Sequence, residues 1–170
     1  MLHRSRGAIL SCALILALVS CSDEPPRLRL EKARLRAKGK TIIAELARKP
    51  EEQARGLMYR RSLGGSEGML FVYNSPVMVS FWMKNTRIPL SIAFMDGSGR
   101  IIHIEQMQPY DPVTRHPSPQ PFQYALEMNQ GWFERNGVGV GDIVEIPNPK
   151  SKSREENSRF LGIRDSGSGI

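Results

Sequence analysis

Apolar side chains occupy every second position in two stretches of the chain, residues 41–47 and 122–128. Such alternation places the apolar residues on one face of an extended chain and the polar residues on the other face. Each stretch therefore predicts a half-buried β-strand.

Four further apolar runs come in two pairs, and residues that favour turns lie between the members of each pair. Asn74, Ser75 and Pro76 separate the first pair, and residues 96–99 (Asp-Gly-Ser-Gly) separate the second pair. We therefore expect two β-hairpins. The runs are residues 68–73 with 77–83 and residues 90–95 with 100–107.

The remaining segments predict short helices, a last strand and one long loop. Pro50 followed by two glutamates is typical of a helix N-terminus, and we expect this helix to end near Met58. Residues 129–136 predict one or two helical turns, and residues 142–146 predict a strand. Five prolines between positions 109 and 121 indicate a surface loop.

These elements predict an α+β, β-rich fold. We expect a curled antiparallel sheet or a small barrel of six to seven strands, with one or two short helices. A parallel α/β fold is disfavoured because no long helices separate the strands.

The N-terminal residues resemble an export signal. Arg4 and Arg6 precede an apolar run too short to span a bilayer, and the run ends in Leu18-Val19-Ser20-Cys21. This ending resembles the lipobox of bacterial lipoproteins, in which Cys21 becomes the lipidated first residue. The alternative is an ordinary signal peptide with an incidental cysteine. We expect lipid on Cys21 to hold the exported chain on the periplasmic side of the cell envelope, and Ser22 favours an outer membrane.

The domain organisation follows from these signals. We expect a signal peptide at residues 1–20, a basic linker that could include a first strand at residues 21–40, and one β-rich domain at residues 41–147. Residues 148–170 are poor in apolar residues and predict a disordered polar tail.

The formal net charge of +7 is concentrated near the N-terminus. Residues 27–40 contain seven bases and one acid, whereas residues 41–147 contain ten bases and eleven acids. The basic segment would face anionic lipid headgroups or serve as a solvated spacer. We expect no nucleic-acid partner for an exported, lipidated chain, and we expect a monomer.

Five sequence motifs resemble one widespread bacterial and archaeal family, known only as domain of unknown function 192, over about residues 41–147. The resemblance implies a compact, β-rich and frequently exported domain, and it implies no established activity. Ser91 occupies a position where the family pattern favours aspartate, which argues against a carboxylate role there. The motifs are RGLMYR (55–60), EGMLF (67–71), FWMKNTRIPL (81–90), ALEMNQGW (125–132) and VGD (140–142).

The densest of these motifs contains the candidate ligand-binding residues. Trp82 and Lys84 lie on the less buried face of the predicted strand 77–83, just before Asn85 and Thr86. An indole beside hydrogen-bond donors suits a flat polar ligand such as a sugar or another ring. In the alternative, Trp82 packs under the proline-rich loop, and the next polar residues satisfy the backbone of a tight turn.

Two further residues complete the candidate binding set. Glu127 lies opposite the apolar face of its predicted strand, where it could line a pocket, and Ser91 follows the Pro-Leu pair of the densest motif.

The candidate catalytic residues are His103 and Glu105, which share one face of a predicted strand. A carboxylate beside a histidine can raise its basicity and make it a general base. The alternative is a solvent-facing pair without a catalytic role. Only one other histidine, His116, remains outside the signal segment, and the methionines lie singly, as core residues do. We therefore expect neither a metal nor a cofactor.

The sequence thus favours a lipid-anchored envelope protein that acts as a binding or accessory module for a small polar ligand or an envelope component. The alternative is a hydrolase or isomerase in which His103, with Glu105 or Glu127, transfers protons. A third interpretation makes the motif residues purely structural. The sequence leaves open whether the protein is an enzyme.

Overall fold

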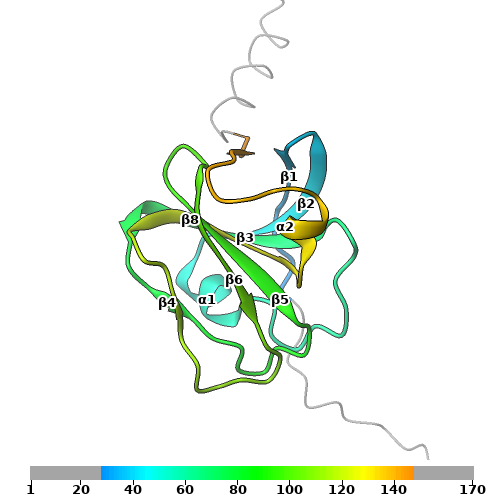
Figure 1. Ribbon diagram of the computed structural model, residues 1–170. Helices are drawn as coiled ribbons and strands as arrows, with labels where there is room; N and C mark the ends of the chain where they lie inside the picture. Colours follow the sequence, from blue (N-terminus) through cyan, green and yellow to red (C-terminus); the bar gives the residue numbers. More distant parts are fainter. Residues whose placement is uncertain (1–27, 148–170) are drawn as a thin grey trace, which may run out of the picture.

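The computed structural model describes residues 28–147, which form a seven-stranded curled sheet, a two-stranded sheet and two short helices (Figure 1). The large sheet has the strand order β6-β5-β8-β3-β2-β1-β9, and β4 pairs with β7. The strands are β1 (Lys32–Ala37), β2 (Lys40–Ala47), β3 (Glu67–Val77), β4 (Ser80–Phe81), β5 (Leu90–Met95), β6 (Ile101–Met107), β7 (His116–Pro117), β8 (Phe122–Asn129) and β9 (Val144–Glu145). The helices are α1 (Pro50–Arg55) and α2 (Trp132–Arg135).

The β-rich fold class and the two short helices are confirmed, with one difference in strand direction. Neighbouring strands of the large sheet are antiparallel except β2 and β3, which are parallel. Residues 48–66 return the chain along the sheet between these two strands and include α1. Parallel neighbours need such a crossover connection, and here a short helix with a loop provides it.

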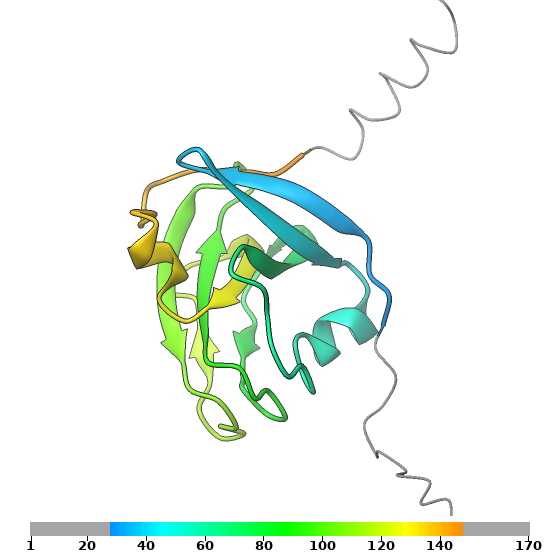
Figure 2. The ribbon, with the colours of Figure 1, turned by 90° about the vertical axis from the view of Figure 1, so that its right-hand side faces the viewer.

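The two edges of the large sheet meet at one end, so that the sheet curls into a partly closed barrel (Figure 2). Arg100 forms an isolated bridge with Ile143, immediately before β6 and β9 respectively. Around this bridge the amide of Ile101 donates to the carbonyl of Asp142 at 2.9 Å, and the amide of Val144 donates to that of Gly99 at 2.9 Å. These bonds satisfy backbone groups that an open edge would expose.

Two hydrophobic clusters cover the two faces of the sheet. One cluster includes α2, β1 and β2 and fills the inside of the curl, with Leu35, Leu126 and Phe133 among its members. The other lies on the opposite face of β3, β5 and β8 and is rich in phenylalanine, including Phe71 and Phe94. The central strands are therefore buried on both faces. For this reason β8 is not half-buried as its sequence alternation predicted.

The predicted hairpin of residues 90–107 is confirmed by β5 and β6, whereas the predicted hairpin of residues 68–83 is wrong. Strand β3 continues through Asn74, Ser75 and Pro76, and a register shift between Val72 and Val77 accommodates these residues opposite β8. A bulge of this kind can absorb turn-forming residues within a strand. Instead of pairing with β3, the next strand, β4, pairs with β7 in the proline-rich loop.

Part of the basic N-terminal segment belongs to the sheet. In β1, Leu35 and Ala37 are buried, whereas Arg34 and Arg36 are exposed on the opposite face of the strand. The predicted lipidation site, Cys21, lies outside the described residues.

Candidate functional site

The site is built around Glu127, which lies in the middle of the sheet. Strand pairing places Met69, Glu127, Ile92 and Glu105 side by side in one row across β3, β8, β5 and β6. The two flanking residues, Met69 and Ile92, are buried and apolar. Glu127 is 5% exposed, and no described residue forms a hydrogen bond or ion pair with its carboxyl group. Burial raises the pKa of Glu127 to about 8 because the ionised form loses its hydration.

Glu127 lies in a small pocket between the sheet and the segment that includes α1. The space measures about 30 Å³, which is enough for one or two water molecules. The charged residue Arg55 and polar groups of Glu127, Thr86 and Gln53 share the lining with aromatic rings. The lining residues are Gln53, Ala54, Arg55, Gly56, Leu57, Met58, Phe71, Phe81, Trp82, Thr86 and Glu127.

Helix α1 and the residues after it form the cover of this pocket. Glu52 accepts hydrogen bonds from the amides of Lys49 (3.0 Å) and Arg48 (2.9 Å), which caps the helix and lowers the pKa of Glu52. The Gln53 side chain donates to the carbonyl of Val72 at 2.9 Å, which ties α1 to β3. Gly56 then ends the helix with a φ of +50°, a conformation that favours glycine.

Two cations lie beside the ring of Trp82, which lines the pocket. The Lys84 ammonium lies 5.2 Å from the centre of the Trp82 ring, and the Arg115 guanidinium lies 4.4 Å from it. Cations at these distances are attracted by the electron-rich ring. Lys84 and Arg115 are exposed, and neither forms an ion pair with a described residue. The expected proximity of Trp82 and Lys84 is therefore present, and Trp82 is half-buried and lines the pocket.

The pairing of β4 with β7 explains why Arg115 lies over Trp82. Ser80 is opposite Pro117 and Phe81 is opposite His116, so the next position in this register brings residue 115 toward residue 82. A further backbone hydrogen bond joins the two segments. The amide of Met83 donates to the carbonyl of Asp111 at 3.0 Å.

Asn85 and Thr86 shape the turn that follows, and only one of them reaches the pocket. Asn85 has a φ of +57°, and its side-chain amide donates to the Tyr59 hydroxyl at 2.9 Å. Thr86 is 4% exposed and lines the pocket, and its hydroxyl bonds to the carbonyl of Lys84 at 3.4 Å. The turn interpretation thus accounts for Asn85, whereas Thr86 belongs to both the turn and the pocket.

Ser91 lies on the other face of the sheet. It pairs with Met128, which belongs to the cluster inside the curl, and its hydroxyl accepts a hydrogen bond from the Gly131 amide at 2.9 Å. Ser91 therefore anchors the segment before α2 and does not line the pocket of Glu127.

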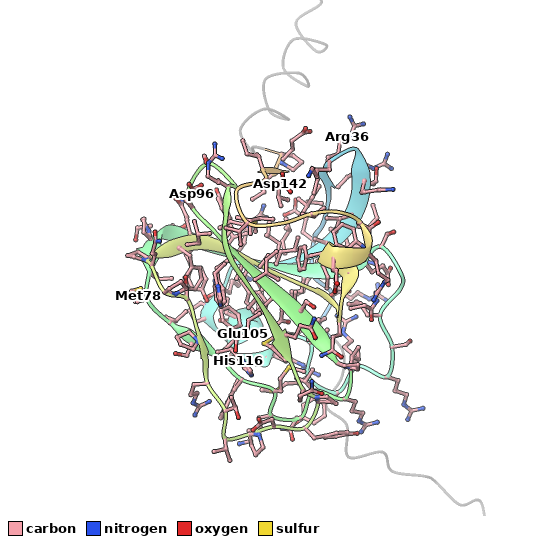
Figure 3. All side chains as sticks on the ribbon, viewed as in Figure 1. Arg36, Met78, Asp96, Glu105, His116 and Asp142 are labelled. Carbon is pink, nitrogen blue, oxygen red and sulfur yellow. The ribbon has the colours of Figure 1, made fainter. Side chains whose placement is uncertain are left out.

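Glu105 and His103 form a separate polar group with His116. The Nδ1 atom of His116 lies 2.7 Å from a Glu105 oxygen, whereas the Nε2 atom of His103 lies 3.9 Å from the other oxygen. Figure 3 shows Glu105 and His116 next to each other beside β6. The ring of His103 also stacks on Phe94, with 6.0 Å between the ring centres. The predicted neighbours His103 and Glu105 are thus adjacent, but the shorter contact of Glu105 is with His116.

The Nε2 atom of His116 is buried and has no hydrogen-bond partner within residues 28–147. The pairing of Nδ1 with a carboxylate is the arrangement that orients a histidine for proton transfer or metal ligation. Neither His103, Glu105 nor His116 lines the pocket of Glu127, however. Among residues 28–147, no three His, Cys, Asp or Glu side chains are grouped so that they could hold a metal ion.

The curled sheet, the two short helices and the pocket beside β8 define a small β-rich domain. The chain belongs to the family of domain of unknown function 192, described as "Uncharacterized ACR", whose model matches residues 33–146. The family therefore also includes β1. None of the curated proteins matches the chain.

Two solved structures share this fold. A protein from Sinorhizobium meliloti 1021, provisionally named a transcription regulator, is 36% identical, with a TM-score of 0.67; the match covers 71% of this chain and 98% of that one. A protein of unknown function from Novosphingobium aromaticivorans DSM 12444 is 39% identical, with a TM-score of 0.64; the match covers 72% of this chain and 94% of that one.

Sequence reasoning missed Arg115, His116 and the contribution of α1. Arg115 and His116 lie in the proline-rich loop, which has no periodicity from which a strand could be predicted. The motif RGLMYR marked residues 55–60 as part of the family pattern, and this signal could have placed the segment beside the Trp82 motif. In the fold, the first four residues of that motif line the pocket with Trp82.

Within residues 28–147, neither helix is long and apolar enough to cross a bilayer.

Proposed function

We propose that this protein binds a small polar ligand in the pocket of Glu127, Thr86 and Trp82. The observation that carries the proposal is the buried carboxyl group of Glu127, which has no partner among the described residues and faces a space of about 30 Å³. Because the described residues give this carboxyl group no partner, only water or a ligand group can bond to it in this space. A ligand group that displaces the water would bond to Glu127 in its place.

The size of the pocket limits how the ligand binds. The space admits one small group and not a sugar ring, so the rest of the ligand would lie outside, beside Trp82. Lys84 and Arg115 would contact that outer part. The predicted binding set is thereby reduced to Trp82, Lys84, Thr86 and Glu127, since Asn85 bonds to Tyr59 and Ser91 bonds to Gly131.

Binding is favoured over proton transfer because the candidate acid–base residues lie apart from the pocket lining. His103 and Glu105 do not line it, and the Nε2 atom of His116 is covered by protein. A purely structural role suits Asn85 and Ser91, whose side chains have protein partners. A purely structural role does not explain the buried carboxyl group of Glu127, which bonds to no described residue.

We further propose that the protein acts in the cell envelope, held to a membrane by lipid on Cys21. The sequence ending in Cys21 supports this location, as does the short apolar run before it. The exposed bases of β1, including Arg34 and Arg36, would then face anionic lipids. In this setting the domain serves as a binding or accessory module for an envelope metabolite or component.

A thermal-unfolding screen of the full-length chain tests the binding proposal. Small polar compounds are added to the wild-type protein, to Glu127→Gln and to Glu134→Gln, which alters an exposed carboxyl on α2. At ten times Kd, a ligand stabilises the native state by about 1.4 kcal/mol, which raises Tm by roughly 5 °C. We expect at least one compound to raise Tm in the wild type and Glu134→Gln but not in Glu127→Gln. Equal responses of all three proteins would contradict the proposal.

A further inference from the structure

The chemistry of the pocket also indicates which ligand group enters it. Three aromatic side chains, Phe71, Phe81 and Trp82, line the space that Glu127 faces. Aromatic faces attract cations, and a buried carboxylate needs a positive partner to remain ionised. An ammonium group, which is about the size of a water molecule, could contact both the aromatic rings and the carboxylate of Glu127. The space of about 30 Å³ is large enough for it.

The cations beside Trp82 indicate a second, opposite charge on the ligand. Lys84 and Arg115 lie 5.2 and 4.4 Å from the Trp82 ring centre, and neither forms an ion pair with a described residue. Each of these exposed cations can pair with a carboxylate or phosphate that lies beside the Trp82 ring. Trp82 is the residue that joins this place to the pocket, because it lines the pocket and contacts both cations.

We propose that the ligand is a small zwitterion, whose primary ammonium group enters the pocket and pairs with Glu127, and whose anionic group lies on Lys84 and Arg115 beside Trp82. This inference rests on the proposed binding function and specifies its ligand class. An amine with an anionic tail satisfies all of these residues together. A neutral sugar would give the two cations no anionic partner.

Pairing with an ammonium group should also release a proton. The charged and titratable groups around Glu127 are Arg55 from the segment of α1, Tyr73 of β3, and Glu105 of β6, which lies beyond Ile92 in the same row. In the empty pocket the pKa of Glu127 is about 8, so about nine-tenths of these carboxyls are neutral at pH 7. The ammonium stabilises the ionised form, and each binding event therefore releases about one proton.

Isothermal titration calorimetry of the full-length chain at pH 7 tests the ligand class. The probes are the ω-amino acids from glycine to 6-aminohexanoate, with hexylamine and hexanoate as analogues that carry one charge each. We expect one zwitterion to bind at least tenfold more tightly than either analogue. In two buffers of different ionisation enthalpy, this zwitterion should release about one proton per molecule bound.

Variants separate the two ends of the ligand. Glu127→Gln should weaken binding of the zwitterion and of hexylamine at least tenfold and abolish proton release. The double variant Lys84→Gln/Arg115→Gln should weaken only the zwitterion, to the level of hexylamine. The matched control, Lys40→Gln/Arg61→Gln, removes two exposed cations elsewhere and should change neither affinity.

The possible results distinguish this inference from the binding function on which it rests. If hexanoate binds more tightly than the zwitterions, or if binding releases no proton, the proposal that the ligand is a zwitterion is wrong. If no ω-amino acid binds while a neutral compound raises Tm in a way that depends on Glu127, the ligand class is wrong and the binding function stands. If neither occurs, both proposals are wrong.

Discussion

At the scale of the residue, the distinctive feature is a carboxyl group placed where the fold offers it no partner. Glu127 lies between Met69 and Ile92 in the row across the sheet, and aromatic rings line the space in front of it. The position is fixed because neighbouring residues of β8 pack into the hydrophobic clusters on both faces of the sheet. This placement leaves the carboxyl group available to a ligand, because no described side chain bonds to it.

Glu127 makes the stability of the protein depend on pH. Its pKa is about 8 in the fold and 4.5 as a model value, so the folded state holds the proton more strongly than the unfolded state. Protonation of Glu127 therefore contributes to the free energy of unfolding. This contribution is fully present below pH 4.5 and is lost as the pH rises through 8. The linkage relation limits it to at most roughly 5 kcal/mol. We expect the free energy of unfolding of the wild type to fall by several kcal/mol between pH 5 and pH 9, relative to Glu127→Gln, in urea titrations.

The control for this measurement is Glu145→Gln, which alters an exposed carboxyl on β9. It should follow the wild type at every pH. Parallel stability profiles of the wild type and Glu127→Gln would show that Glu127 is not held in the neutral form.

The sequence predicted some of these residues and could not predict others. Trp82 and Lys84 were expected to lie together because they are two positions apart in an extended stretch, and their contact in the fold agrees. Arg115 comes from a distant loop, and only the pairing of β4 with β7 brings it there. The partner of Glu105 was missed for the same reason, since His116 lies in that loop.

At the scale of the element, the close approach of β3 and β8 sets the position of Glu127. Gly68 lies on β3 opposite Met128. A Cβ atom at Gly68 would lie 2.6 Å from the backbone oxygen of Glu127 and 2.4 Å from the sulfur of Met128. The methionine side chain can move, but the strand backbone cannot do so without disturbing the sheet. The glycine in the EGMLF motif therefore has a packing role.

Gly68→Ala should destabilise the protein by about 2–3 kcal/mol, because the added methyl group overpacks the contact between β3 and β8. The matched control is Gly65→Ala, where an added Cβ meets nothing within 4 Å, and its effect should stay within about 0.5 kcal/mol. Urea unfolding of both variants measures the difference. Equal stability of the two variants would contradict the close approach of the strands.

Elements were predictable where local pattern and tertiary pairing agree. The Asp-Gly-Ser-Gly turn joins β5 and β6 as expected, and the Asp96 side chain accepts hydrogen bonds from Ser98 and Arg100 within that turn. Asn74, Ser75 and Pro76 favour a turn, but here they lie within β3. The pairing of β3 with β8 continues on both sides of the register shift and keeps the strand extended. The parallel pairing of β2 with β3 has no short-range signal, because it depends on how residues 48–66 return the chain.

At the scale of the whole molecule, the turn end of β1, which carries Arg36, lies away from the polar group of Glu105 and His116. Figure 2 shows β1 and β2 across one end of the domain, with α1 and α2 on opposite sides of the molecule. Arg36, on β1, lies at the upper right in Figure 3, whereas Glu105 and His116 lie below the middle of the domain. A membrane-facing β1 would thus leave the other end of the domain turned toward the envelope space.

Replacement of Cys21 tests the proposed membrane attachment. Two or more acyl chains hold a protein stably on a bilayer, whereas one chain binds only marginally. We expect the wild-type protein in the membrane fraction of cells and Cys21→Ser in the soluble envelope fraction. Cys12→Ser is the control, because Cys12 lies within the proposed signal segment and its loss should leave the wild-type distribution unchanged. Equal distributions of wild type and Cys21→Ser would argue against lipidation.

The most direct test of the central claim is a ¹³C NMR pH titration of the Glu127 side-chain carboxyl in the full-length protein, with and without 6-aminohexanoate. Our account predicts that the carboxyl titrates near pH 8 in the protein alone, and that the ligand moves its midpoint to lower pH by pairing with the ionised form. A midpoint near pH 4.5 that does not change when 6-aminohexanoate is added would contradict the claim that Glu127 is a buried carboxyl group to which a ligand binds.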